Sequence, residues 1–129
     1  MSGEGAEQGK VLRLGALEAQ VMEVLWDHGP ATIREVIDRL PSEPVYTTIA
    51  TVLANLDRKH LVTITRQNRS TRYAARMGRH EHAAQMMEQV LQASRDRAAS
   101  ILQFVDSMPE NDLDLLRDYL KRRDQGIPS

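Results

Sequence analysis

The chain has 129 residues, a length that suits one small domain with an accessory arm. It contains no cysteine, which excludes disulfides, thiolate metal sites and a cysteine nucleophile and favours a cytoplasmic protein. No apolar run approaches the roughly 20 residues that a membrane-spanning helix needs, so we expect no membrane insertion. The Gly- and Glu-rich start, residues 1–10, is expected to be a disordered tail.

Charge is distributed unevenly along the chain. The net charge of −1 divides into −3 over residues 1–30, +5 over residues 31–79, where nine bases face four acids, and −3 over residues 80–129. A basic middle between acidic ends is typical of a nucleic-acid-binding protein with a separate partner region. The alternative interpretation is uneven solvation of an ordinary surface.

The first two predicted elements are helices. In "LGALEAQVMEVLWDHGP" the apolar residues recur at helical spacing, and the Gly-Pro pair ends the helix. In "ATIREVIDRLP" Thr32 and Glu35 form a capping box, in which each side chain accepts the other's free backbone N–H, and Pro41 ends the helix. The residues predicted to be buried are Leu17, Val21, Val24 and Leu25 in the first helix, and Val36, Ile37 and Leu40 in the second.

The stretch "VYTTIATVLANLDRKHLV" predicts a third helix, at about residues 46–59, with an unusual uncharged polar face. Successive residues turn by about 100°, which gathers Thr47, Thr48, Thr51, Asn55 and Arg58 on one side. Threonine can bond a phosphate or a base edge and touch a thymine methyl, and asparagine can pair with adenine. A solvent-exposed helix without a ligand is the alternative, but threonine is a poor helix former for that purpose. The apolar residues on the opposite side are Ile49, Val52, Leu53 and Leu56.

A β-hairpin is predicted over residues 61–76, with strands "LVTITR" and "RYAAR" separated by the polar turn "QNRST". Three helices followed by a hairpin predict a mainly α fold with a winged helix-turn-helix over residues 11–78, whose third helix enters the DNA major groove. The arginines of the wing, at about residues 65–73, could grip phosphates or enter a minor groove. Alternatively, they keep a sheet edge from aggregating. The predicted DNA contacts are Tyr46, Thr47, Thr48, Thr51, Asn55, Arg58, Arg66, Arg69 and Arg72, with Lys10 and Arg13 as weaker candidates.

Residues 79–124 are predicted to form a helical dimerisation arm, followed by a tail at 125–129. Ser107 and Glu110 are expected to cap the last of its helices. About 45 residues in short helices cannot bury this much apolar surface alone, so the arm either folds back on the winged domain or meets a second copy. The second copy is favoured, because two symmetric readers about one DNA turn (~34 Å) apart match a palindromic site. The predicted dimer residues are Met87, Val90, Leu91, Ile101, Phe104, Val105, Leu113, Leu116, Tyr119 and Leu120.

Other chemistry finds little support in the sequence. His80 and His82 lie two positions apart, and on a helix such side chains diverge too far to share a metal ion easily. There is no Gly-rich phosphate loop and no credible Ser/His/Asp set. We therefore expect neither an enzyme nor a metal or cofactor. A protein-interaction module without sequence-specific DNA binding is the remaining alternative function.

Four stretches carry a resemblance to a known family: "LGALEAQVMEVLW", "YTTIATVLANLDRKHLV", "TRYAAR" and "ILQFV". Over about residues 11–124 the chain resembles the penicillinase-repressor family of bacterial winged-helix repressors, the BlaI/MecI type. The resemblance implies a homodimeric transcriptional repressor that binds a palindromic operator in double-stranded DNA. Asn55 stands where the family often has a basic residue, which implies a weakened phosphate contact or an altered base contact, so the family's exact operator is not transferred. His60 stands where the family often has glycine, so the turn after the helix is expected to be tolerated and not ideal.

The resemblance also implies a route of release. In family members tied to β-lactam sensing, a membrane protease cuts the repressor before a phenylalanine in the second dimerisation helix. The matching bond here is Gln103–Phe104, although the family pattern has asparagine in place of the glutamine. The resemblance thus adds a sensor protease to the expected partners. The alternative is that Phe104 is simply a buried residue of the dimer.

Overall fold

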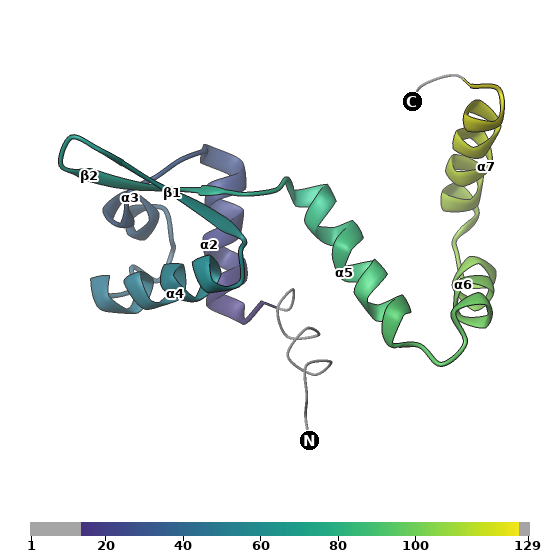
Figure 1. The fold of residues 1–129 in the computed structure, drawn as a ribbon, viewed down its shortest axis with the longest axis horizontal. Helices are drawn as coiled ribbons and strands as arrows, with labels where there is room; N and C mark the ends of the chain where they lie inside the picture. Colours follow the sequence, from purple (N-terminus) through teal and green to yellow (C-terminus); the bar gives the residue numbers. More distant parts are fainter. Residues whose placement is uncertain (1–13, 127–129) are drawn as a thin grey trace. The chain divides into compact units, whose positions relative to one another are not determined.

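The computed structural model describes residues 14–126 (Figure 1). The predicted tail at residues 1–10 and the candidate contacts Lys10 and Arg13 lie outside the described residues. Two compact units divide between Gln89 and Val90, and no described helix is both long and apolar enough to span a lipid bilayer. The elements are α2 (Ala16–His28), α3 (Ile33–Asp38), α4 (Tyr46–Arg58), β1 (Val62–Gln67), β2 (Ser70–Ala75), α5 (Arg79–Ala93), α6 (Arg97–Asp106) and α7 (Glu110–Asp124).

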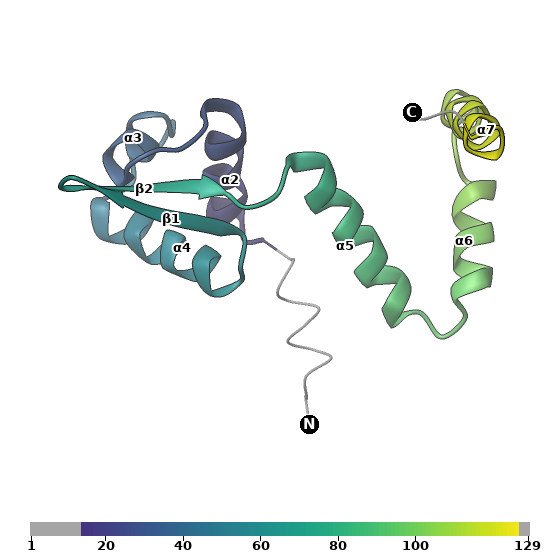
Figure 2. The ribbon, with the colours of Figure 1, turned by 45° about the horizontal axis from the view of Figure 1, so that its top comes forward.

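The first unit packs three helices and the base of the hairpin around one hydrophobic core. Strand β1 lies against α4, and β2 lies against α2 and α3 (Figure 2). This arrangement is a winged helix, as predicted, with α4 as the helix directly before the hairpin. The predicted core is confirmed at Val21, Val24, Leu25, Val36, Leu40, Ile49, Val52, Leu53 and Leu56, whereas Leu17 and Ile37 are only half-buried.

Local sequence signals set the ends of these helices. The Thr32 amide donates to Glu35 Oε1 at 3.0 Å and the Glu35 amide to Thr32 Oγ1 at 3.2 Å, which confirms the capping box. Gly29 ends α2 with a φ of +83°. At the end of α4, His60 adopts a left-handed φ of +63°, and the next amide, of Leu61, reaches back to the Leu56 carbonyl at 2.9 Å. His60 therefore takes the conformation that helix ends usually reserve for glycine.

The hairpin turn is tighter than predicted. Gln67 pairs with Ser70, so the turn holds only Asn68 and Arg69, and the expected five-residue turn is wrong. Asn68 supplies a φ of +55°, which asparagine tolerates better than most residues. The base of the hairpin is fixed to the core, because Val62 is 1% exposed. The rest of β1, including Ile64 at 47% exposure, is open to solvent.

A short bridge ties the hairpin to the segment between α2 and α3. Ala31 and Tyr73 exchange two backbone hydrogen bonds, from the Ala31 amide at 2.9 Å and from the Tyr73 amide at 2.8 Å. Ala31 itself is fully buried. The wing therefore leaves the core from a fixed base, and its position relative to α3 is determined by backbone bonds.

The start of α5 packs within the first unit. Trp26 Nε1 donates to the Met77 carbonyl at 2.9 Å, and the Arg79 guanidinium lies 5.3 Å from the centre of the Trp26 ring. Arg79 also bonds Glu23 and Asp27 of α2. The sequence places a domain boundary between residues 78 and 79, where α5 begins. The first compact unit continues to Gln89, because these contacts hold the start of α5 against α2.

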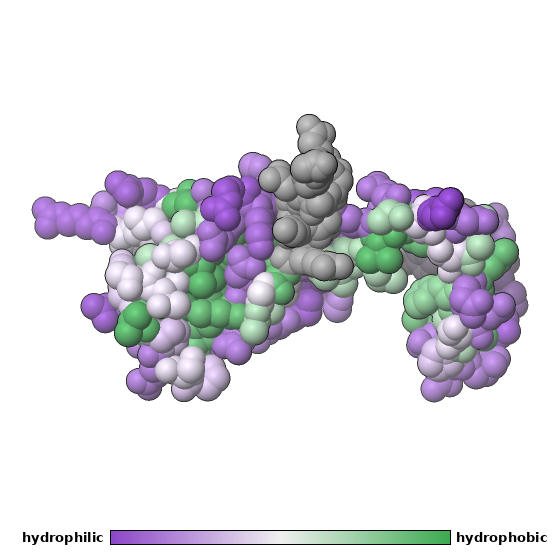
Figure 3. All heavy atoms as spheres, turned by 90° about the horizontal axis from the view of Figure 1, so that it is seen from below, coloured by the Kyte–Doolittle hydropathy of each residue, from purple (hydrophilic) through white to green (hydrophobic). Residues whose placement is uncertain are grey.

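The second unit leaves its apolar residues uncovered. No residue of α6 or α7 is buried, and apolar side chains lie at the surface of the arm (Figure 3). The expected Ser107–Glu110 cap is wrong, because Pro109 precedes α7 and the Ser107 hydroxyl donates to the Gln103 carbonyl of α6 at 3.0 Å. Among the predicted dimer residues, Met87, Val90, Ile101, Phe104 and Leu120 are exposed, and Leu91, Val105, Leu113, Leu116 and Tyr119 are half-buried.

Candidate nucleic-acid interface

Helix α4 presents the polar face that the sequence predicts. Thr47, Thr48 and Thr51 are exposed, Tyr46 is 47% exposed, and Asn55 is half-buried. The opposite face is packed in the core, so the helix cannot rotate to hide these side chains. Its first turn carries no acid. The exposed face can therefore accept a polyanion without like-charge repulsion from that turn.

An ion pair fixes the far end of α4. Lys59 Nζ lies 2.9 Å from Glu18 Oε1 and 3.1 Å from Oε2, and the Glu18 side chain is only 12% exposed. Although burial opposes ionisation, the bonds from Lys59 and from the Gly15 amide hold the pKa of Glu18 below its usual value. Lys59 is thus engaged with α2, which leaves Arg58 as the exposed base at this end of the helix.

The three wing arginines have different environments. Arg66 and Arg69 are exposed, whereas Arg72 Nη1 bonds Glu35 Oε1 at 3.0 Å. Glu35 also accepts the Thr32 amide, and that bond, together with the charge of Arg72, lowers the pKa of its carboxyl. Arg72 therefore links the wing to α3, a role that sequence reasoning missed because the two partners lie 37 positions apart.

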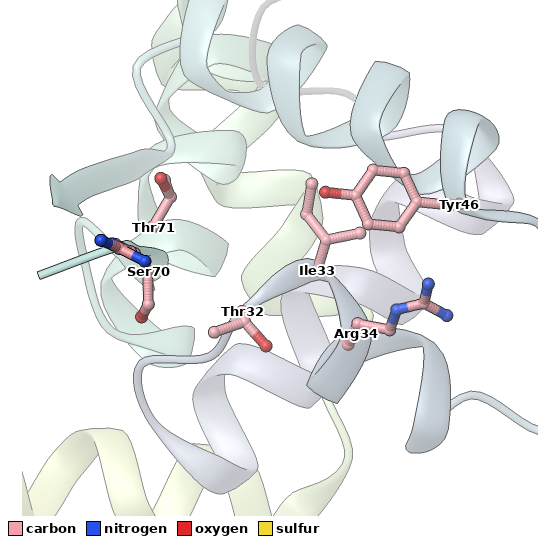
Figure 4. A pocket seen from close by; sticks show the side chains of 7 residues that line it. Thr32, Ile33, Arg34, Tyr46, Ser70 and Thr71 are labelled. Atoms are coloured by element: carbon pink, nitrogen blue, oxygen red, sulfur yellow. The ribbon is translucent and has the colours of Figure 1, made fainter. Parts of the chain in front are cut away.

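A cleft lies between the wing, the start of α3 and the start of α4. Its volume is about 340 Å³, and Figure 4 shows Tyr46 extending from α4 with its hydroxyl toward the wing. The Arg34 guanidinium lies 5.6 Å from the centre of the Tyr46 ring. Sequence reasoning did not select Arg34, although it belongs to the basic middle of the chain. The lining residues are Thr32, Ile33, Arg34, Tyr46, Arg69, Ser70 and Thr71.

The structure brings some of the predicted DNA contacts together and separates others. Tyr46 and Arg69 line one cleft, although they come from different elements. Arg58 is the last residue of α4, at the opposite end from Tyr46. Arg72 forms an ion pair with Glu35. The candidate surface is therefore a helix face with a basic cleft at one end and Arg58 at the other.

The candidate cleavage bond lies inside a helix. Gln103 and Phe104 belong to α6, and Phe104 is 54% exposed. The Gln103 carbonyl accepts bonds from the Ser107 amide at 3.1 Å and from the Ser107 hydroxyl at 3.0 Å. A protease would have to unwind this part of α6 to reach the bond, because proteases bind their substrates in an extended conformation.

The two histidines at the start of α5 differ in exposure. His80 is exposed, whereas His82 is 5% exposed and packs 5.6 Å from the Trp26 ring, centre to centre. In the part of the chain that the structure describes, His82 Nε2 has no hydrogen-bond partner. Among residues 14–126, no three His, Cys, Asp or Glu side chains gather as metal ligands.

Comparison with known proteins places this geometry in a family. The penicillinase repressor family model matches residues 14–122. The transcriptional regulator BlaI of Mycobacterium tuberculosis, from strains CDC 1551 and H37Rv, is 37% identical over 123 residues, which cover 91% of this chain and 89% of the relative.

Two solved structures align with the chain at lower similarity. A MarR family protein from Bacillus stearothermophilus matches 95% of this chain and 84% of its own, with a TM-score of 0.48 and 13% identity. The YusO protein from Bacillus subtilis matches 94% of this chain and 79% of its own, with a TM-score of 0.48 and 17% identity. The family match spans both units of the structure, and the chain belongs to the penicillinase repressor family.

Proposed function

We propose that this protein is a homodimeric repressor, acting in the cytoplasm, that binds a palindromic operator in double-stranded DNA. Its family and its curated relatives are transcriptional regulators, so it is a regulator of transcription and not an enzyme. The observation that carries the proposal is the exposed, hydroxyl-rich face of α4, which is held rigidly by its buried side and flanked by exposed arginines.

The side chains of this surface divide into two roles. Thr47, Thr48, Thr51 and Asn55 read bases, because short polar side chains let the helix approach the floor of the major groove. Arg58, Arg66 and Arg69 contact phosphates, which positions the helix but carries no sequence information. We assign Arg72 a positioning role, because its charge is engaged with Glu35. Tyr46 contacts the backbone at the start of the helix.

Dimerisation is supported by the arm. Its apolar side chains stay exposed in the single chain, among them Val90 at 71%, Leu102 at 65% and Leu115 at 68%. A second copy would remove this surface from water, at about 25 cal/mol per Å² of apolar area. Two-fold symmetry of the dimer then matches the symmetry of a palindromic operator.

Release from DNA by a sensor protease is the finer part of the proposal. It is supported by the position of Gln103–Phe104 in α6, an exposed helix without buried residues. Isolated helices shorter than about 12–15 residues are marginal in water, so α6 can unwind locally wherever a partner does not cover it.

The proposal is tested by selecting DNA with the full-length protein. The protein is mixed with a library of random duplexes, and the bound fraction is sequenced over several rounds. We expect an inverted repeat whose half-sites lie about one helical turn (~34 Å) apart. Affinity for it should fall as a steep power of salt concentration. Weak binding that is indifferent to sequence would instead favour a protein-interaction module.

A further inference from the structure

We infer that the cleft between α3, α4 and the wing binds one phosphate of the operator backbone. Arg34 and Arg69 are its cationic ligands, and Tyr46 is the positioning residue that holds Arg34 in place. This inference rests on the proposed function, since it names a contact of the same DNA-binding surface. It adds Arg34, a residue of α3, to a surface otherwise made of α4 and the wing.

The chemistry of the cleft suits a phosphodiester. Of its seven lining residues, only Ile33 lacks a side-chain hydrogen-bond donor. Two are arginines, and the others carry hydroxyls from Thr32, Tyr46, Ser70 and Thr71, which Figure 4 shows around one space. No acid lines it. A phosphodiester accepts hydrogen bonds and donates none, so every polar side chain of the lining can serve it.

The charge of Arg34 is available to a ligand. Among the described residues, its contact is the Tyr46 ring, at 5.6 Å from the ring centre, and no carboxylate pairs with it. A contact between a cation and an aromatic ring is electrostatic and does not occupy the guanidinium N–H groups as a paired carboxylate would. The nearest acid in sequence, Glu35, is already occupied by Arg72 and by the Thr32 amide. The neighbouring carboxylate therefore does not compete for Arg34.

The position of the cleft gives the contact a consequence for DNA binding. Tyr46 is the first residue of α4, directly before Thr47 and Thr48, and Arg69 lies at the tip of the wing. A phosphate held between them is fixed next to the base pairs that these threonines read. Such a contact sets the register of the helix in the groove without choosing a base.

Salt titration of operator binding tests the assignment. Arg34→Ala should weaken binding to matched and altered half-sites alike. The fall of log affinity with log salt should become less steep, by about 0.9 for each half-site. Arg39→Ala is the matched control, because Arg39 is an exposed arginine at the other end of α3 that does not line the cleft. It should leave the slope unchanged. Equal slopes for Arg34→Ala and the wild type would overturn the inference.

Operators with single neutral methylphosphonates locate the contact. One backbone position in each half-site should weaken wild-type binding and weaken Arg34→Ala clearly less, because only Arg69 then remains as a cationic ligand. Arg34→Ala should keep the full sensitivity of the wild type at all other positions. Tyr46→Phe should keep the sensitive backbone position of the wild type, because the ring that positions the Arg34 guanidinium remains, and Tyr46→Ala should lose it as Arg34→Ala does. Additive losses for Arg34→Ala at every position would refute the site.

The two levels of the proposal can fail separately. If the wild type binds no inverted repeat, the proposed function fails and this inference fails with it. If the wild type binds an inverted repeat and Arg34→Ala retains its salt slope and its methylphosphonate profile, only the inference about the cleft fails. Circular dichroism of each variant confirms that the exposed substitutions leave the fold intact.

Discussion

At the scale of single residues, the proposed interface divides side chains that contact bases from side chains that contact only the phosphate backbone. Thr48 is exposed on α4 beside other hydroxyls, while Arg66 is exposed on the wing. A threonine on a recognition helix can contact a base edge or a thymine methyl, whereas an arginine on a wing contacts the phosphate backbone. The two types of residue should therefore give distinct signatures when they are removed.

Replacing Thr48 by alanine should reduce discrimination between the cognate half-site and an altered one by ~1–3 kcal/mol, because a base contact is lost. Replacing Arg66 by alanine should weaken binding to both duplexes by similar factors and lower the salt slope. Fluorescence anisotropy on the two duplexes at several salt concentrations measures both effects. If the two variants lose affinity in the same pattern, the division of roles is wrong.

Glu18 gives a pH-dependent contribution to stability. Because its pKa is lower in the folded than in the unfolded chain, its bonds stabilise the fold fully above the unfolded value of about 4.3 and lose that effect as pH falls through the folded value. Glu18→Gln should therefore lower the free energy of unfolding at pH 7 by about 1.5–3 kcal/mol. The difference from the wild type should shrink toward pH 3.

Urea unfolding at both pH values measures this difference. Glu43→Gln is the control, since Glu43 is exposed and makes no ion pair among the described residues. Its effect on the unfolding free energy should be small at either pH. A Glu18→Gln deficit that persists undiminished at pH 3 would show that the effect is one of packing and not of charge.

At the scale of helices and strands, the sequence predicts what depends on neighbours in the chain. The capping box of α3, the Gly29 end of α2 and the buried stripes arise within a few residues of each other, so periodicity and caps reveal them. The Lys59–Glu18 pair, the Arg72–Glu35 pair and the cleft at Arg34 join segments that lie far apart in the chain. No local pattern contains them, and only the packed fold brings them together.

His60 tests how well a helix end tolerates a residue other than glycine. Its φ of +63° costs a non-glycine residue roughly 1–2 kcal/mol. His60→Gly should remove that strain, but glycine makes the unfolded chain more flexible, which costs about 0.4–1 kcal/mol of stability. The net result should be a free energy of unfolding that is higher by roughly 0.5–1 kcal/mol. Chemical denaturation measures the change.

Ala54→Gly provides the matched control in the same helix, where φ is negative and glycine brings no relief. That variant should lose about 1 kcal/mol. If both glycine variants destabilise the protein equally, the left-handed conformation of His60 carries no strain.

At the scale of the whole molecule, the proposed function makes DNA affinity depend on joining two DNA-binding domains. A chain that ends at Gln103 keeps α2–α5, the wing and most of α6, but loses the end of α6 from Phe104 onward and all of α7. It should bind a single half-site as tightly as the full chain does. It should bind the full palindrome far more weakly than the full chain, because a second DNA-binding domain is no longer held at a high effective concentration next to the second half-site. Equal affinity of both proteins for the palindrome would sink the idea that cutting at Gln103–Phe104 releases the operator.

The dimer itself is best tested by one charge on the arm. Val90 is 71% exposed in the single chain, so Val90→Glu should cost the fold little, yet an unpaired charge buried in an interface is strongly destabilising. Gln85→Glu adds the same charge to another exposed position of α5 and should leave the dimer intact. Sedimentation should find Val90→Glu monomeric and both the wild type and Gln85→Glu dimeric. Occupancy of the operator by Val90→Glu should rise with the square of the concentration of that variant. A dimeric Val90→Glu protein would place the contact between subunits elsewhere.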